Sequence, residues 1–247
     1  MREYPLTQKQ LRILKLSYKF RFVTVNLLAE HLGLAISTMS TNIKILHRRK
    51  LLDRRYDKKD KLAGRGAQYY LTTKGIKELK QVMDLNDGVA RSFYKNKSVS
   101  DAFVEHSLAI FKAYLAIRNQ YPEQFTILTK TESADYDQFP EPKPDLFLQS
   151  DAASYFLYLY TDTQLFVIQK HIKQTIEHEN EGEWPGSFPS VLIACPNPRI
   201  EHKLQKHLEP LLEDFEFYTT TSKALLSEKP EKAIWSDPVE PEKLTIL

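Results

Sequence analysis

Apolar residues recur at helical spacing in three successive stretches near the N-terminus. These positions are Leu11, Leu14 and Tyr18, then Leu27, Leu28 and Leu32, then Met39, Ile43 and Leu46. Thr7, Thr24 and Ser37 stand where helix N-caps are expected, because a hydroxyl can accept a hydrogen bond from a free backbone N–H group. Gly33 gives the second helix a stop signal. The pattern predicts three helices, the third ending near Arg49, with a short β-prone segment at 21–23.

Two short strands joined by a charged loop are expected next. Residues 50–56 and 68–72 have strand character, residues 57–66 are mostly charged, and another helix begins at Thr73. A disordered basic loop is the alternative for 57–66, but it does not account for the apolar and aromatic residues that follow. The order helix–helix–helix–strand–loop–strand–helix predicts a winged helix-turn-helix over residues 1–83.

The remaining chain has the pattern of an α/β domain. Residues 84–100 are polar and turn-rich, which predicts a linker. The expected elements are a helix at 101–120, strands at 125–131, 144–149 and 155–160, a helix at 164–179, a strand at 190–194, a helix at 199–212 and a strand at 215–220. This α-β-β-β-α-β-α-β order is typical of the PD-(D/E)xK nuclease fold, here assigned to residues 101–226. The Pro-, Glu- and Lys-rich tail, 227–247, is expected to be poorly ordered, although Ile234 and Trp235 could dock.

Charge is divided unevenly between the two parts of the chain. Residues 1–83 hold 19 of the 35 Lys and Arg residues and six of the 32 Asp and Glu residues, a formal charge of +13; the remainder carries −10. Such a division favours a polyanionic partner for the N-terminal part. A solubility gradient without a partner is the alternative.

The third helix is the expected recognition helix, because its early turns would enter the major groove of duplex DNA. No acidic residue lies between Glu30 and Asp53. Small polar and cationic side chains can reach base edges and phosphates, and a merely solvated helix is the other interpretation. Cations in the following segment would contact phosphates or the minor groove, although placement at a helix C-terminus accounts for two of them. The predicted DNA-binding residues are Ser37, Thr38, Ser40, Thr41, Asn42, Lys44, Arg48, Arg49, Arg54, Arg55, Lys58, Lys59, Lys61 and Arg65.

A nuclease centre has weak support in the second domain. Asp145 stands where the first acid of the fold belongs, but the third strand lacks an acid-x-Lys. Asp162, with Lys170 or Lys173, could replace the missing groups, yet one well-placed carboxylate holds Mg²⁺ poorly. We therefore expect a degenerate site and no enzyme activity, with Asp145 beginning a strand. His171 and His178 share a helix face without a third ligand.

Composition excludes several other classes. Cys195 is the single cysteine, so the chain can form neither an intrachain disulfide nor a cysteine cage for zinc. The seven glycines make neither a P-loop nor a dinucleotide-binding fingerprint. Neither a membrane span nor a signal peptide is evident, so a cytoplasmic protein is expected. The sequence indicates no cofactor.

The order of several motifs resembles the replication-relaxation family of plasmid and mobile-element proteins. The motifs are Leu6-Thr7-x-x-Gln10-Leu11-x-Ile13-Leu14, Arg21-Phe22-Val23-Thr24, Tyr69-Tyr70-Leu71-Thr72-Thr73-Lys74-Gly75, His106 and Pro144-Asp145. The resemblance covers about residues 5–225 and implies a winged helix joined to a nuclease-like domain, with DNA-reading positions at Thr38, Thr41, Asn42 and Lys44. The chain departs from the family at Tyr158 and Leu159, where an acidic residue usually occurs.

These observations favour a non-enzymatic accessory protein that binds a specific site on double-stranded DNA. Its second domain would dimerise or recruit a relaxase or replication protein; dimerisation is expected because winged helices commonly bind palindromic sites in pairs. A transcriptional regulator would use the same chemistry. A metal-dependent nuclease, or a regulator with a small-molecule pocket lined by Tyr155, Phe156, Tyr158 and Tyr160, is an alternative for the second domain, although core packing also explains these aromatic residues.

Overall fold

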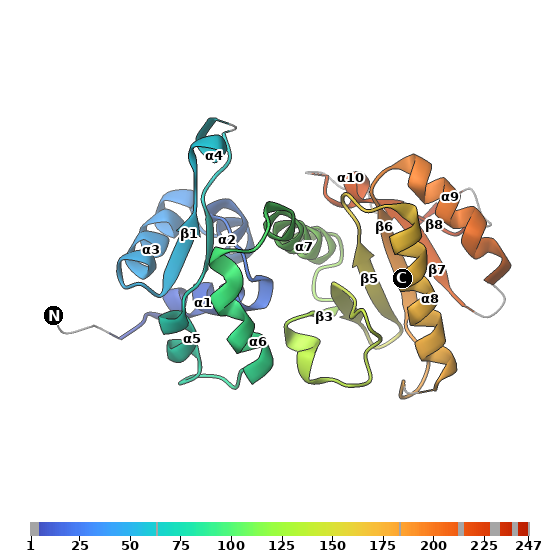
Figure 1. The fold of residues 1–247 in the computed structure, drawn as a ribbon, viewed down its shortest axis with the longest axis horizontal. Helices are drawn as coiled ribbons and strands as arrows, with labels where there is room; N and C mark the ends of the chain where they lie inside the picture. Colours follow the sequence, from blue (N-terminus) through green and yellow to red (C-terminus); the bar gives the residue numbers. More distant parts are fainter. Residues whose placement is uncertain are drawn as a thin grey trace. The chain divides into compact units, whose positions relative to one another are not determined.

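The computed structural model describes residues 5–62, 64–182, 184–211, 215–227, 233–238 and 242–246. The chain divides into two compact units, Met1–Phe111 and Lys112–Leu247, and each contains helices and strands (Figure 1). This confirms the expected mixed α+β class. The division falls within one long helix, α7, whereas the sequence suggested a boundary before that helix.

Unit 1 begins with the three expected helices, α1 (Gln8–Phe20), α2 (Val25–Leu32) and α3 (Ile36–Arg48). Thr7 caps α1 and forms a reciprocal capping box with Gln10, and the hydroxyl of Thr24 caps α2. Gly33 ends α2 in the left-handed conformation, at φ 62°. The prediction for α3 was wrong by two residues, because Ala35 occupies the N-cap position and Ser37 lies inside the helix.

A two-stranded antiparallel hairpin follows the helices. Strand β1 (Leu52–Arg55) pairs with β2 (Gln68–Leu71), and Val23 adds an isolated bridge to Tyr69. The segment between the strands contains a short helix, α4 (Lys58–Leu62), where the sequence suggested only a loop. In Figure 1, α4 lies at the far end of the hairpin, away from the helices of unit 1. The hairpin therefore projects from the body that anchors it.

The base of the hairpin is fixed by the start of α5 (Thr73–Leu79). The Thr72 hydroxyl donates to the Lys50 carbonyl at 2.6 Å and accepts from the Gly75 amide at 3.0 Å. Gly75 packs so closely that an added Cβ would lie 2.2 Å from the Leu51 carbonyl oxygen. Only a residue without a side chain fits this approach.

The segment at 84–100 differs from the expected linker because it folds as part of unit 1. It forms α6 (Asp87–Ser92) and a 3₁₀ helix, η1 (Phe93–Lys97), before α7 (Asp101–Gln120) begins. The Arg21 guanidinium donates to the Ser92 carbonyl and to the Asn96 side chain, at 3.3 and 2.6 Å. It also lies over the rings of Phe93 and Phe103. Burial lowers the pKa of Arg21, and these contacts compensate for the lost hydration.

The described residues of unit 2 form a mixed seven-stranded sheet whose strands follow one another in sequence order. Strands β3, β4 and β5 are antiparallel neighbours, β5, β6 and β7 run parallel, and β8 and β9 add antiparallel pairs at the edge. The strands are β3 (Thr126–Thr129), β4 (Leu146–Gln149), β5 (Ser154–Leu159), β6 (Ser190–Cys195), β7 (Phe217–Thr221), β8 (Trp235–Ser236) and β9 (Lys243–Leu244). Helix α8 (Leu165–Asn180) connects β5 to β6, and α9 (Pro198–Leu208) connects β6 to β7. The order of long elements from α7 to β7 is the predicted one; the short elements η2 (Glu132–Asp135), η3 (Glu209–Leu211) and α10 (Ser222–Leu225) were not foreseen.

The core of unit 2 lies between one face of the sheet and helices α8 and α9. It combines strand side chains such as Phe156, Ile193 and Phe217 with Ile168 of α8 and Leu204 of α9. Alternate residues of a strand face opposite sides of the sheet, so β5 contributes Phe156 and Tyr158 to this face. Phe156 and Tyr158 are therefore core residues, as core packing predicts.

The described part of the tail is more ordered than the sequence suggested. Ile234 and Trp235 are buried, and β8 pairs with both β7 and β9. The predicted docking of Ile234 and Trp235 is confirmed. Residues 228–232, 239–241 and 247 of the predicted tail lie outside the described residues.

Substituting Gly75 with alanine should destabilise unit 1 by about 1–3 kcal/mol, the usual cost of overpacking a filled site. The new methyl group would lie 2.2 Å from the Leu51 carbonyl oxygen and 2.9 Å from the Leu71 side chain. The closer contact is with the backbone, which cannot move aside as a flexible side chain can. Urea unfolding followed by far-ultraviolet circular dichroism measures the change. Gly66→Ala is the matched control, because its added Cβ has nothing within 4 Å. Equal stability of the two variants would contradict the close packing.

Cys195 should resist thiol reagents in the folded protein. Its side chain is fully buried, and burial, followed by the charge of Glu201, raises the pKa of the thiol to about 12. The reactive thiolate is therefore scarce at pH 8, and the reagent has no access. Ellman's reagent should release almost no product from the folded chain and one equivalent in urea. Rapid release of a full equivalent without denaturant would be incompatible with this burial.

Candidate nucleic-acid interface

Helix α3 has one buried and one exposed face. Met39, Ile43 and Leu46 are at most 1% exposed and hold the helix against the rest of unit 1. Residues 37, 38, 41, 44 and 48 are exposed, while 40, 42 and 49 are partly covered. Most of the residues predicted to bind DNA from α3 therefore lie at its surface.

The polar side chains in the middle of α3 are held by their own helix. The Thr41 hydroxyl donates to the Ser37 carbonyl at 3.0 Å, and the Asn42 side-chain amide donates to the Thr38 carbonyl at 2.9 Å. These bonds orient both side chains before any partner arrives. The Thr41 hydroxyl oxygen and the Asn42 amide oxygen keep acceptor capacity toward a ligand.

Asp53, the first acidic residue after α3, accepts hydrogen bonds from two neighbours. Tyr70 donates its phenol hydrogen to Asp53 at 3.2 Å, and the Arg54 amide donates to the other oxygen of Asp53 at 2.8 Å. Burial, with a further contribution from Asp53, raises the pKa of Tyr70 to about 12, so the phenol stays neutral and donating. These hydrogen bonds hold the Asp53 carboxylate in place on β1.

The two arginines of β1 have different surroundings. Arg54 is exposed, as phosphate binding would require. Arg55 instead donates to the Val99 carbonyl and pairs with Asp101 at the start of α7, both at 2.5 Å. The structure thus separates two residues that the sequence placed in one cationic cluster, and Arg55 has a clear structural role.

The hairpin tip, which we define as residues 56–66, contains further predicted cations. Lys58 and Lys61 are exposed. Arg65 forms ion pairs with Asp60 at 3.1 Å and with Glu105 at 3.3 Å, although its side chain remains half exposed. The side chain of Lys59 lies outside the described part of the structure.

The sequence analysis missed exposed apolar residues of α3 and of the hairpin tip, of which Ile36 and Leu62 are the most exposed. Ile36, in the first turn of α3, is 59% exposed, and Leu62, in the hairpin tip, is 80% exposed. The residues predicted to bind DNA in this region are all polar or cationic, so these apolar side chains were not among them. A large apolar side chain within a charged loop was the available signal for Leu62.

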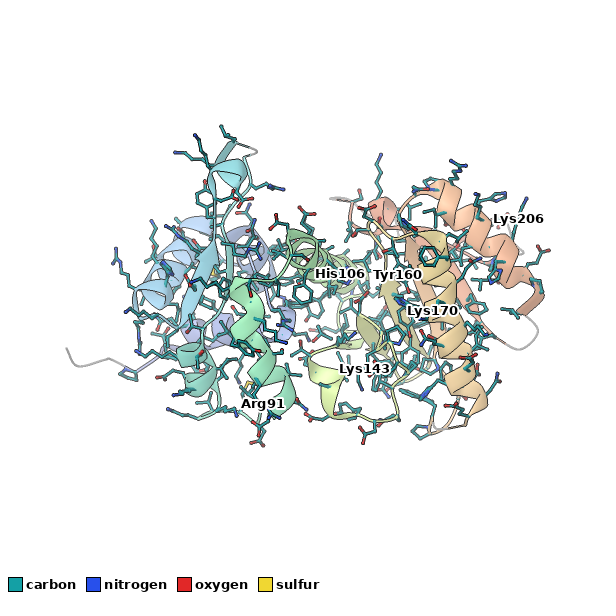
Figure 2. The ribbon with its side chains drawn as sticks, viewed as in Figure 1. Arg91, His106, Lys143, Tyr160, Lys170 and Lys206 are labelled. Atoms are coloured by element: carbon teal, nitrogen blue, oxygen red, sulfur yellow. The ribbon has the colours of Figure 1, made fainter. Side chains whose placement is uncertain are left out.

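The candidate metal centre in unit 2 does not assemble. The Asp145 carboxylate accepts the Leu159 amide at 2.8 Å, which ties β4 to β5. Asp162 and Lys170 are exposed, as is Lys173, which forms a helical ion pair with Glu177 (Lys170 and Tyr160 are labelled in Figure 2). Among the described residues, no three His, Cys, Asp or Glu side chains group as metal ligands.

Tyr158 in β5 and Tyr160 just after it face the core near Asp145. The Tyr158 hydroxyl lies 2.9 Å from that of Thr175, and the Tyr160 hydroxyl lies 3.1 Å from Nδ1 of His171, both partners being on α8. Burial raises the pKa of both phenols, and the Asp145 charge adds to the effect. Burial and the nearby Lys130 lower the pKa of His171. The two neutral phenols suit packing and hydrogen bonding rather than metal coordination.

The chain belongs to the replication-relaxation family, since the model of that family matches residues 14–163. This confirms the resemblance inferred from the sequence motifs, and the match includes both α3 and Asp145. It associates the chain with replication or relaxation of plasmids and mobile elements. A comparison with curated proteins gives no match. None of the helices in the described residues is long and apolar enough to cross a membrane.

Proposed function

We propose that the protein binds double-stranded DNA as an accessory factor in plasmid or mobile-element replication, relaxation or mobilisation. The observation that carries the proposal is the exposed face of α3, which is free of acid, on a helix that packs against strand β1 of a projecting basic hairpin. In this interpretation unit 1 is a winged helix-turn-helix, α3 enters the major groove and the hairpin tip is the wing. A transcriptional regulator would use the same surface.

The chemistry of the exposed face matches the two tasks of a DNA interface. Lys44, Arg48 and Arg54 are extended cations suited to phosphates, which supply affinity without sequence information. Thr41 and Asn42 are short, oriented and suited to base edges in the major groove. We therefore assign affinity mainly to the cations and sequence preference mainly to the polar pair.

Unit 2 is proposed to act without catalysis. Its element order is the one expected of a PD-(D/E)xK nuclease domain, but Tyr158 and Leu159 occupy the region where an acidic residue usually occurs. An α/β unit that lacks metal-binding groups can still provide a surface for protein contacts. We propose that this unit dimerises the protein or recruits a relaxase or replication protein.

DNA binding should depend steeply on salt. Duplexes selected from a random pool should bind in mobility-shift assays, with log K falling linearly as log salt concentration rises. Lys44→Ala and the pair Lys58→Ala/Lys61→Ala should reduce the slope by about 0.9 for each phosphate that is no longer neutralised. Lys97→Ala, an exposed lysine on η1, is the matched control and should retain the slope. Absence of binding, or affinity independent of salt, would refute the proposed function.

Supercoiled plasmid incubated with the protein and Mg²⁺ or Mn²⁺ should remain intact. A single carboxylate that is already bonded to backbone offers too few ligands for a catalytic metal. Agarose electrophoresis detects nicking, and Asp145→Ala is the diagnostic variant. Nicking by the wild-type chain that disappears in this variant would establish the nuclease alternative.

A further inference from the structure

Leu62 is an apolar side chain displayed among charges. It exposes 80% of its surface, compared with 70% for Tyr94 and 64% for Phe166. It ends α4 and directly follows residues 58–61, which are three lysines and one aspartate. Exposure of a leucine side chain to water is unfavourable. An exposed leucine held by an ordered turn therefore indicates a binding surface.

The hairpin tip has such a supporting structure. The Asp57 carboxylate accepts the Asp60 amide at 2.9 Å, and the Asp60 carboxylate accepts the Asp57 amide at 3.2 Å. The backbone amide of Arg65 then closes the turn on the Asp60 carbonyl at 2.9 Å, and its side chain pairs with the same aspartate. These bonds join Asp57, Asp60 and Arg65, which lie before and after Leu62 in the sequence. The leucine is therefore presented at a defined position on the hairpin.

The neighbouring charges indicate the kind of partner. Lys58 and Lys61 are exposed on the same short helix and favour an anionic surface. The Leu62 side chain needs an apolar environment within that anionic surface. Duplex DNA offers both, because its phosphates border a groove whose stacked bases can be separated by a single inserted leucine.

An anionic membrane would also combine charge with an apolar interior. Stable insertion into a bilayer requires an apolar helix face, or several apolar groups, rather than one side chain. Leu62 is the single large apolar residue of α4, whose sequence is Lys-Lys-Asp-Lys-Leu. A wedge between bases requires only one such residue, so the observations favour DNA.

We propose that Leu62 enters the minor groove as a wedge that partly unstacks one base step and kinks the duplex. Lys58 and Lys61 then contact the phosphates on either side of the groove. This inference rests on the proposed DNA binding and extends it, since it assigns a deformation of the DNA to one side chain. The deformability of the sequence at that step would contribute to site choice without any hydrogen bond to a base.

The test uses the full chain and a selected duplex that carries 2-aminopurine at successive positions. Wild-type protein should increase the fluorescence at one step by severalfold, because unstacking relieves quenching. Bending should be visible as a changed energy transfer between dyes at the two duplex ends. Leu62→Ala should lose both signals while its affinity falls less than tenfold, and Leu62→Met should retain them.

The outcomes separate the wedge from DNA binding itself. Wild-type binding without any fluorescence change or bend would overturn the wedge and leave the proposed function standing. The same signals in Leu62→Ala would also overturn it. If wild-type protein binds no duplex, both proposals fail. Vesicles containing phosphatidylserine provide the remaining arm, in which binding that depends on Leu62, without an effect on DNA, would assign the residue to a membrane instead.

Discussion

The candidate interface depends on the burial of one face of α3. Met39, Ile43 and Leu46 are held in the core of unit 1, and this contact fixes the rotation of the helix about its axis. Because residues four apart share a helix face, the same rotation exposes Ser37, Thr41 and the cations beyond them. The apolar contact thus determines which side chains a partner can reach, and electrostatics acts on a surface that packing has already selected.

Local signals allowed much of unit 1 to be predicted. Thr7, Thr24 and Gly33 act within one turn of their own helices, so their effects are encoded in adjacent residues. The ion pairs of Arg55 and Arg65 with Asp101 and Glu105 span 46 and 40 residues. A count of nearby charges cannot reveal such pairing. This is why the cationic cluster expected from the sequence contains both exposed residues and residues with structural partners.

The second unit was predictable as an order of elements but only partly as a site. Alternating and continuous apolar runs gave the long strands, and the missing acid-x-Lys was visible in the sequence. The hydrogen bonds of Tyr158 to Thr175 and of Tyr160 to His171 required the packing of α8 against β5. These two hydrogen bonds join the sheet to α8, and the buried rings of Tyr158 and Tyr160 belong to the core of unit 2.

Charge and shape act at different places in unit 1. At the base of the hairpin, Thr72 and Gly75 fix the strands by hydrogen bonding and close approach, with no ionic contribution. Along the hairpin, Arg55 and Arg65 use their charges on the carboxylates of α7, which stabilises the position of the strands. Of the described hairpin cations, Arg54, Lys58 and Lys61 are exposed. The neutral contacts at the base of the hairpin are less sensitive to salt than ionic contacts with a separate polyanion, so added salt should reduce binding without moving the base of the hairpin.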